Sequence, residues 1–351
     1  MAESLAPVKI GVLDDTPSPG MNRETFDRVA RLAFGDVSRR FARPVEFVFE
    51  RVDGLPWGSA KALEDGYRAL VDAGVIAIIG PAMGDDATVA TELADRAEMP
   101  TINWAGTERG RSDFMFHLQI GSHEDEPLLL ARYLVDHSLR NVAVVVERAV
   151  IGQRYGRFFE EACDALEIDI STRLSSTPGE TDFGPTLTAL EKSNADAIVF
   201  LGLGHTHPPI AEGLRALGHP GPWLTNSYGM FGWTSPESAA ALDGWIYVDQ
   251  VSDRNPAFRS VAERLGVSLE KGPISVFFLV ELLRLIAEGL ARAPELTRRG
   301  VRDGLERIKP LPSALGAPGT FAGFGHFERG ALKGPYLVLR RWQDGRSLEV
   351  D

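Results

Sequence analysis

Two adjacent acidic residues, Asp85 and Asp86, stand at a predicted helix start. They lie in the stretch AIIGPAMGDDATVATELADRA (residues 77–97), which begins as a buried strand, breaks at Gly80-Pro81 and continues at helical spacing. The N–H groups and positive dipole end of a helix start usually attract an anion. A carboxylate there could instead accept hydrogen bonds from an amide, amine or hydroxyl group of a ligand. It could equally cap the helix, which contributes about 0.5–2 kcal/mol and needs no ligand.

A second polar cluster, GHTHPP at residues 204–209, places His205 and His207 two positions apart on a turn. A metal ion would need further ligands, and the neighbouring sequence offers neither cysteine nor paired carboxylates. No metal or other cofactor is therefore predicted. We expect either a cleft-facing histidine, His205, that hydrogen-bonds the ligand, or a pH-sensitive surface pair.

An enzymatic interpretation would use Asp85 and Asp86 as acid and base, with Ser18 or Ser227 as nucleophile. No G-x-S-x-G elbow, P-loop or G-x-G-x-x-G motif accompanies them. Acids at adjacent positions of a helix start also normally diverge. The sequence therefore predicts a protein that is not an enzyme.

The composition excludes several classes of partner. The 351 residues carry a formal net charge of -12, which disfavours binding to nucleic acid or to an anionic membrane. Cys163 is the single cysteine, so neither an intrachain disulfide nor a cysteine-based metal site can form. The most apolar long stretch, residues 274–290, carries Glu281, Arg284 and Glu288 on one helical edge. That pattern predicts a packed amphipathic helix and no membrane span.

Short apolar runs alternate with helical patterns through most of the chain, an order that indicates parallel α/β sheets. The alternation occurs twice and predicts two Rossmann-like lobes with open parallel sheets. Strands are expected at residues 8–13, 45–52, 75–80 and 100–104, and again at 141–147, 168–176, 195–202 and 222–227. After residue 250, helices are expected at 255–266, 274–292 and 295–308, followed by a strand pair. This tail is too short for a third core, so it should complete the two lobes.

Several segments resemble the type I periplasmic binding proteins, in particular their Leu/Ile/Val-binding branch. TPGETDFGPTLTALEKSNADAIVFLG (177–202) is similar to the T-x-G-x-x-D-F segment of that branch, and FERGALKGPYLVLRRWQDG (327–345) to its G-x-L-K-G hairpin. AIIGPAMGDDATVA and PTINWAGT resemble the third strand-turn-helix and the next strand-turn. The resemblance covers essentially the whole chain in order.

This resemblance implies two lobes joined by a three-crossover hinge, with a ligand cleft between them that closes over a small molecule. Lobe 1 would comprise residues 1–121 and 251–327, and lobe 2 residues 122–250 and 328–351. Physical reasoning agrees, because ligands of open α/β sheets bind beyond the carboxyl ends of the strands.

The turns after the strands supply the candidate ligand-binding residues. These are Ser18, Trp57, Met83, Asp85, Trp104, Ala105, Thr107, Ile151, His205, Ser227 and Tyr228. Trp57, Trp104 and Tyr228, together with Phe231 and Trp233, could line a pocket that stacks a flat or apolar ligand. The alternative is that some of these rings only pack their loops onto the lobes.

The resemblance also shows departures from amino-acid binders. Asp85 aligns with the Ser or Thr that holds the ligand carboxylate in those relatives, while Ala105 and Thr107 preserve their A-x-T turn. The lobe 2 positions that read the ammonium group fall near Gly204-His205 and Asn226-Ser227, with no carboxylate, and an aromatic position becomes Ile151. We therefore expect a neutral or weakly cationic aromatic or amide-type ligand in place of a standard branched-chain amino acid.

The resemblance leaves two biological settings open. One is the receptor of an ABC importer, whose partners would be the ligand and the permease subunits; the other is a cytoplasmic ligand sensor of the same fold. Residues 1–7 lack the basic and apolar regions of a signal peptide, so the protein is cytoplasmic if Met1 is native and extracytoplasmic if a signal was removed. A branched-chain amino acid or aromatic acid remains the alternative ligand, and the protein could be a monomer or a dimer.

Overall fold

The computed structural model describes residues 6–16, 21–231, 240–267 and 275–350. Two compact units make up the chain, Met1–Ile120 with Val251–Tyr336 and Gly121–Gln250 with Leu337–Asp351. The backbone thus passes from one unit to the other three times. Residues 328–336 belong to the first unit, whereas the sequence placed them in the second. The reason is that the strand at Leu332–Lys333 pairs within the first unit.

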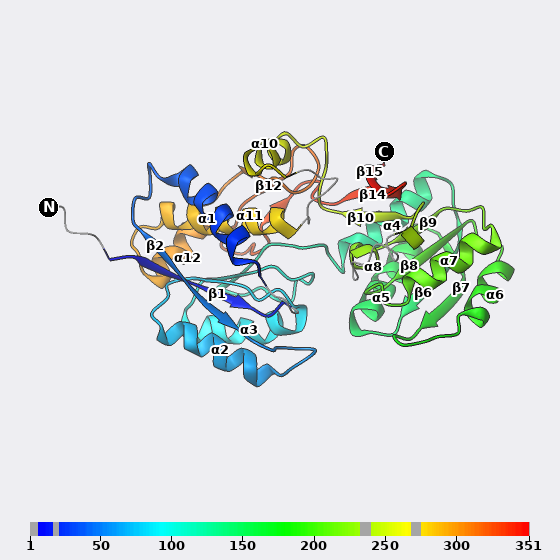
Figure 1. The fold of residues 1–351 in the computed structure, drawn as a ribbon, viewed down its shortest axis with the longest axis horizontal. Helices are drawn as coiled ribbons and strands as arrows, with labels where there is room; N and C mark the ends of the chain where they lie inside the picture. Colours follow the sequence, from blue (N-terminus) through cyan, green and yellow to red (C-terminus); the bar gives the residue numbers. More distant parts are fainter. Residues whose placement is uncertain (1–5, 17–20, 232–239, 268–274, 351) are drawn as a thin grey trace. The chain divides into compact units, whose positions relative to one another are not determined.

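The first unit contains a five-stranded parallel sheet (Figure 1). Its strand order is β2-β1-β3-β4-β5, so the first strand lies inside the sheet and the chain winds outward in both directions from it. The strands are β1 (Val8–Asp14), β2 (Val45–Arg51), β3 (Ile78–Ile79), β4 (Thr101–Asn103) and β5 (Met115–His117). All five point the same way, which puts their carboxyl ends at one edge.

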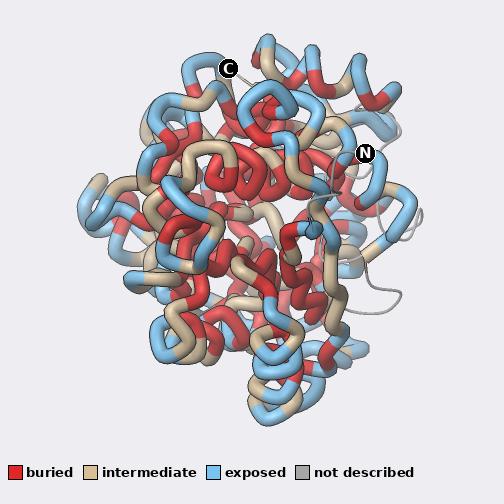
Figure 2. Tube along the Cα trace, turned by 90° about the vertical axis from the view of Figure 1, so that its left-hand side faces the viewer, coloured by how far each residue is buried: buried red, intermediate tan, exposed pale blue. Residues whose placement is uncertain are grey.

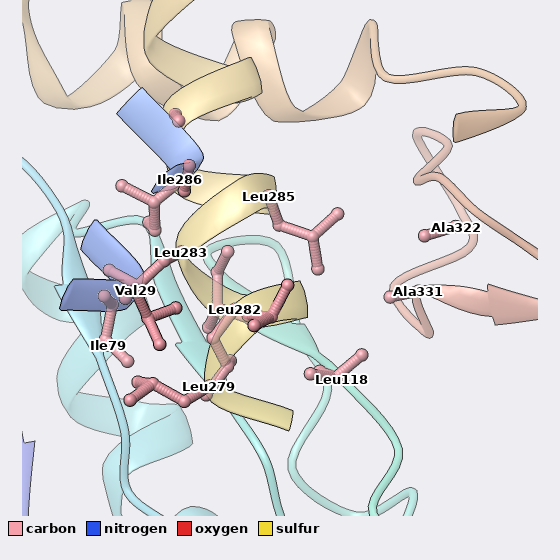
Figure 3. Packing of buried hydrophobic residues seen from close by; sticks show 14 of the residues in the cluster. Val29, Ile79, Leu118, Leu279, Leu282, Leu283, Leu285, Ile286, Ala322 and Ala331 are labelled. Atoms are coloured by element: carbon pink, nitrogen blue, oxygen red, sulfur yellow. The ribbon is translucent and has the colours of Figure 1, made fainter. Parts of the chain in front are cut away.

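Helices cover both faces of this sheet (Figure 1). They are α1 (Arg23–Val37), α2 (Ala60–Asp72), α3 (Gly84–Ala97), α10 (Pro256–Leu265), α11 (Ser275–Arg292) and α12 (Arg298–Glu306). Ile10 and Val12 of β1 pack toward α1 and α11, whereas Leu13 packs toward α2 and α3. Figure 3 shows apolar residues of α11 next to Val29 of α1 and Ile79 of β3. Period-two burial along the strand thus separates the two cores.

Helix α11 carries the charged edge that the sequence indicated, and its acids have partners. Glu281 is buried and accepts a hydrogen bond from the Ala314 N–H at 3.0 Å. Glu288 accepts two from the Arg40 guanidinium, at 2.7 and 2.9 Å. Within the described ranges, no helix combines the length and apolar character needed to span a membrane.

A small antiparallel sheet completes the first unit. It consists of β11 (Leu311–Pro312), β12 (Phe321–Ala322) and β13 (Leu332–Lys333), in that order. A bridge between His117 and Gly330 links it to the end of β5. The late segment therefore adds to an existing core, as the sequence predicted.

The second unit contains a seven-stranded sheet in the order β15-β14-β10-β9-β8-β6-β7. Five strands are parallel, namely β6 (Asn141–Glu147), β7 (Asp169–Ser176), β8 (Ala197–Leu201), β9 (Trp223–Thr225) and β10 (Ile246–Asp249). The antiparallel strands β14 (Val338–Gln343) and β15 (Arg346–Glu349) form one edge. The α/β fold with two parallel-sheet units is therefore confirmed.

The helices of the second unit are α4 (Asp125–Asp136), α5 (Val150–Ala165), α6 (Gly184–Lys192), α7 (His207–Leu217) and α8 (Ser227–Phe231). Val144 of β6 packs with α4 and α5, and Val145 packs with α6 and α7 on the opposite face. Cys163 of α5 is buried, and burial raises the pKa of its thiol to about 12. Buried residues gather in the interior, while exposed residues lie mostly along the outer turns (Figure 2).

Candidate functional site

Polar side chains gather at the carboxyl edge of the first sheet, where sequence reasoning placed ligand contacts. Asp15 follows β1 directly and is buried. Its Oδ1 accepts a hydrogen bond from the Ala82 N–H at 2.7 Å, and its Oδ2 accepts one from the Met83 N–H at 2.8 Å. One carboxyl group after β1 thus holds the turn that follows β3, and this turn leads into α3.

Asp86 lies in the first turn of α3 and is fully buried. Its Oδ1 accepts a hydrogen bond from the Leu55 N–H at 2.9 Å, in the turn after β2. Burial raises the pKa of Asp86 to about 7, and the neighbouring charge of Asp15 acts in the same direction. Burial also raises the pKa of Asp15, although its two backbone hydrogen bonds oppose the shift.

Neither acid caps α3, so the capping interpretation is wrong for both. The helix begins at Gly84 and its N-cap is Met83, whose side chain makes no capping hydrogen bond. The helix starts this early because Asp15 fixes the Ala82 and Met83 N–H groups just ahead of it. Asp86 turns inward to Leu55, and the Asp85 side chain is exposed.

The other predicted residues of the first unit occupy different environments. Trp57 is 67% exposed in the turn after β2, and Met83 and Trp104 are half-buried. Ala105 and Thr107 are fully buried, and the Thr107 methyl group packs closely beside the Gly84 backbone. The turns after β3 and β4 therefore meet. Ser18 lies outside the described residues.

Two residues that sequence reasoning did not select lie behind Ala105. The Arg111 Nε–H donates to His117 Nδ1 at 2.9 Å. Because that nitrogen accepts, the other ring nitrogen carries the proton and donates to the Ala105 carbonyl at 2.7 Å. These two hydrogen bonds, from Arg111 to His117 and from His117 to Ala105, hold the A-x-T turn in place. Arg111 and His117 do not lie in a turn between a strand and the following helix, so the pattern of strand-end turns does not select them.

The second unit repeats the device at its own carboxyl edge. Glu147, the last residue of β6, is buried and accepts hydrogen bonds from the Leu203 N–H at 2.7 Å and the Thr206 N–H at 2.9 Å. These donors flank His205 in the turn after β8. The Gly152 Cα also lies against the Glu147 carbonyl, so that an added Cβ would be 2.2 Å from the oxygen. In each unit, a buried acid at the end of the first strand accepts hydrogen bonds from the turn that follows the adjacent strand, β3 beside β1 and β8 beside β6.

The two histidines of GHTHPP lie in different surroundings. His205 is exposed, whereas His207 is fully buried, with its ring stacked on Phe200 and edge-on to Trp245. Its Nδ1 bonds to the Gly229 carbonyl at 2.8 Å, and burial lowers its pKa to about 3. The interpretation as a pH-sensitive surface pair is therefore wrong, since His207 is buried in the core. Across the described ranges, no group of three or more His, Cys, Asp or Glu residues could hold a metal.

A buried carboxylate that sequence reasoning missed supports the turn after β9. Glu126 of α4 accepts hydrogen bonds from the Ser227 N–H at 2.7 Å and the Ser227 hydroxyl at 2.9 Å. It accepts two more from the Ser122 N–H at 2.8 Å and the Tyr155 hydroxyl at 3.0 Å. Burial raises the pKa of Glu126 to about 7, and these donors oppose the shift. The sequence had indicated no carboxylate at the turn containing Ser227.

The remaining predicted residues of the second unit are half-buried. Ile151 lies in the first turn of α5 and packs on the apolar core, and Tyr228 lies on α8 beside Ser227. Asn226 exchanges two hydrogen bonds of 2.9 Å with the backbone of Gly202. Phe231 ends α8, and Trp233 lies outside the described residues. The turns after β8 and β9 are thus fixed by buried polar groups, with exposed or half-buried side chains at their tips.

The chain is similar to known binding proteins over nearly its whole length. A family model described as periplasmic binding protein matches residues 7–337. The Leu/Ile/Val-binding protein homolog 3 of Brucella melitensis is 24% identical over 237 residues, which span 63% of this chain and 60% of that protein.

Solved structures share the fold at low identity. An ABC transporter substrate-binding protein of Desulfitobacterium hafniense in complex with Leu superposes with a TM-score of 0.80 at 17% identity, covering 98% of this chain and all of that one. The branched-chain amino acid transporter substrate-binding protein of Streptococcus pneumoniae with isoleucine gives 0.77 at 16% identity, with 98% and 99% covered.

Proposed function

Because the chain belongs to the periplasmic binding protein family, we propose that it is the solute receptor of an ABC importer and holds a small organic molecule. The family is non-catalytic. The similar solved structures are those of transporter substrate-binding proteins, which supports the transport role. In this proposal the ligand contacts the turns at the carboxyl edges of the sheets, and permease subunits are the protein partners.

We further propose that the ligand is neutral or weakly cationic, and aromatic or amide-bearing. The exposed carboxylate of Asp85 on the first turn of α3 is the observation that carries this proposal. Two more carboxyl groups, those of Asp15 and Asp86, are buried at the same edge. A ligand carboxylate at this edge would meet like charge, whereas an N–H or O–H donor would gain a charge-assisted hydrogen bond.

Aromatic side chains at the same turns support the aromatic part of the proposal. Trp57 exposes most of its indole, and Trp104 and Tyr228 are half-buried. A large exposed ring at a strand-end turn offers an apolar face on which a planar ligand can stack.

A ligand screen by thermal shift tests the class. We expect stabilisation by neutral amides or aromatic amines and none by the multiply charged polyamines, since a ligand at 100 times its Kd adds about 2.7 kcal/mol of stability. Leucine, isoleucine, valine and aromatic acids complete the panel. Tight leucine or valine binding without any response to amides or amines would contradict the ligand class and leave the receptor role intact.

Asp85→Ser should weaken binding of the amide or amine found in that screen by about tenfold, because one charge-assisted hydrogen bond is lost. Isothermal titration calorimetry measures the change. Glu92→Ser, which removes an exposed acid further along α3, is the matched control and should leave the affinity unaltered. Equal affinities of Asp85→Ser and the unmodified protein for every binding compound would rule out contact between Asp85 and the ligand.

A further inference from the structure

Two buried carboxyl groups connect three strand-end turns of the first unit. Asp15, after β1, holds the Ala82 and Met83 N–H groups of the turn after β3. Asp86, on α3, holds the Leu55 N–H group of the turn after β2. The two carboxyl groups also interact with each other. The turns that carry Trp57, Met83 and Asp85 therefore depend on this one pair.

One oxygen of the Asp15–Asp86 pair, Asp86 Oδ2, is free to carry a proton. Asp86 Oδ2 is buried and has no donor among the described residues, and it lies so close to Gly54 that an added Cβ would be 1.9 Å away. Asp15 uses both of its oxygens as acceptors of backbone N–H groups. A proton on Asp86 Oδ2 would turn that unpaired acceptor into a donor to Asp15.

The charges around the pair also favour a proton. The further charged group acting on Asp86 is Asp85, which is negative as well. Arg51, near the end of β2, pairs with Asp14 at 3.5 Å. Two ionised carboxylates in buried contact would repel each other strongly, and one shared proton removes this repulsion.

We propose that Asp86 keeps a proton that it donates to Asp15, and that this proton holds the ligand-contacting turns of the first unit in place. Loss of the proton puts two negative charges in contact and loosens the turns. Asp86 is then a positioning residue, and ligand affinity falls as the pH rises. The part of the inference that concerns affinity rests on the proposed function.

The sign of the effect on stability follows from linkage. The folded state holds this proton up to the pKa of Asp86, about 7, whereas an unfolded aspartate has an ordinary pKa of 3.8. Between these values the folded state binds more protons than the unfolded state, so stability decreases as the pH rises. Above about pH 7, the contribution of the Asp86 proton to the free energy of unfolding no longer changes with pH.

The titration itself is measured on the ligand-free protein by 13C NMR of labelled aspartate carboxyl groups. We expect one aspartate to titrate near pH 7, to be missing in Asp86→Asn and to persist in Asp85→Asn. The asparagine amide can donate to Asp15 and accept from Leu55 at every pH, which makes it a permanent mimic of the protonated acid. If every aspartate titrates near pH 4 in the unmodified protein, the inference is overturned, whether or not the variants fold.

Urea unfolding midpoints and ligand affinities supply the positioning readout. Asp86→Asn should remove the Asp86 part of the fall in midpoint between pH 4 and pH 7 and leave the part that Glu126 contributes, whereas Asp85→Asn should retain the whole fall. For the compound that binds best in the panel, affinity should be about tenfold weaker at pH 8 than at pH 6, and Asp86→Asn should abolish that difference. A pH-independent affinity of the unmodified protein would overturn the positioning role. A panel without any binder would contradict the proposed function, while the aspartate titration would still decide the shared proton.

Discussion

Replacing Glu126 by alanine is expected to destabilise the second unit by about 3–5 kcal/mol, because four donors lose the acceptor that they share. The Ser122 and Ser227 N–H groups and the Ser227 and Tyr155 hydroxyls all donate to this carboxylate. The two backbone N–H groups cannot turn away. Urea unfolding followed by circular dichroism measures the loss, and hydrogen exchange of α4 and α8 locates it.

Glu126→Gln and Glu161→Ala are the intermediate variant and the surface control for Glu126→Ala. Glu126→Gln keeps one oxygen acceptor but turns an amide donor toward the remaining donors, so its loss should fall between those of the unmodified protein and Glu126→Ala. Glu161→Ala removes an exposed acid of α5 that pairs with Arg157 at 3.5 Å, and should change stability by less than about 0.5 kcal/mol. If Glu126→Ala matched Glu161→Ala, the network around Glu126 would be energetically unimportant.

The architecture could be predicted from the sequence because inner strands such as β1 and β6 are nearly continuous in apolar residues, and the edge strand β7 alternates apolar with polar residues. The helices between them carry an apolar stripe. The run at residues 141–147 became β6, with Val144 and Val145 in opposite cores. The resemblance to type I periplasmic binding proteins is confirmed by the family match. The last boundary was misplaced by nine residues, because the Leu332 N–H donates to Gln119, 213 residues away in sequence, a long-range contact without a local signal.

The candidate site was predictable only at the level of turns. Strand ends can be read from the sequence, so the turns around Asp85, Ala105 and Ser227 were identified. Which of two adjacent acids turns inward depends on where α3 begins, and Asp15, about 70 residues away, sets that start. Glu126 was passed over for the same reason, since its partner Ser227 is 101 residues distant in sequence.

Two helical glycines of the first unit should respond to alanine in opposite directions. At Gly304 in α12, an added Cβ would lie 2.1 Å from the Gly289 carbonyl oxygen and 2.8 Å from the Ala293 nitrogen. Both atoms belong to the backbone of α11 and the residue following it, so neither can swing aside. Gly304→Ala should therefore force α11 and α12 apart and cost about 2–4 kcal/mol.

Gly35, in α1, has no heavy atom within 4 Å of the added Cβ. Gly35→Ala should therefore stabilise the unit by about 0.5–1 kcal/mol, because alanine restricts the unfolded chain without a clash. The same urea unfolding transition measures both variants, which removes differences of probe and reference state. Parallel changes in the two variants would contradict close backbone packing between α11 and α12. Helix propensity favours alanine at both sites, so stability changes of opposite sign would assign the loss in Gly304→Ala to the clash with the Gly289 carbonyl of α11.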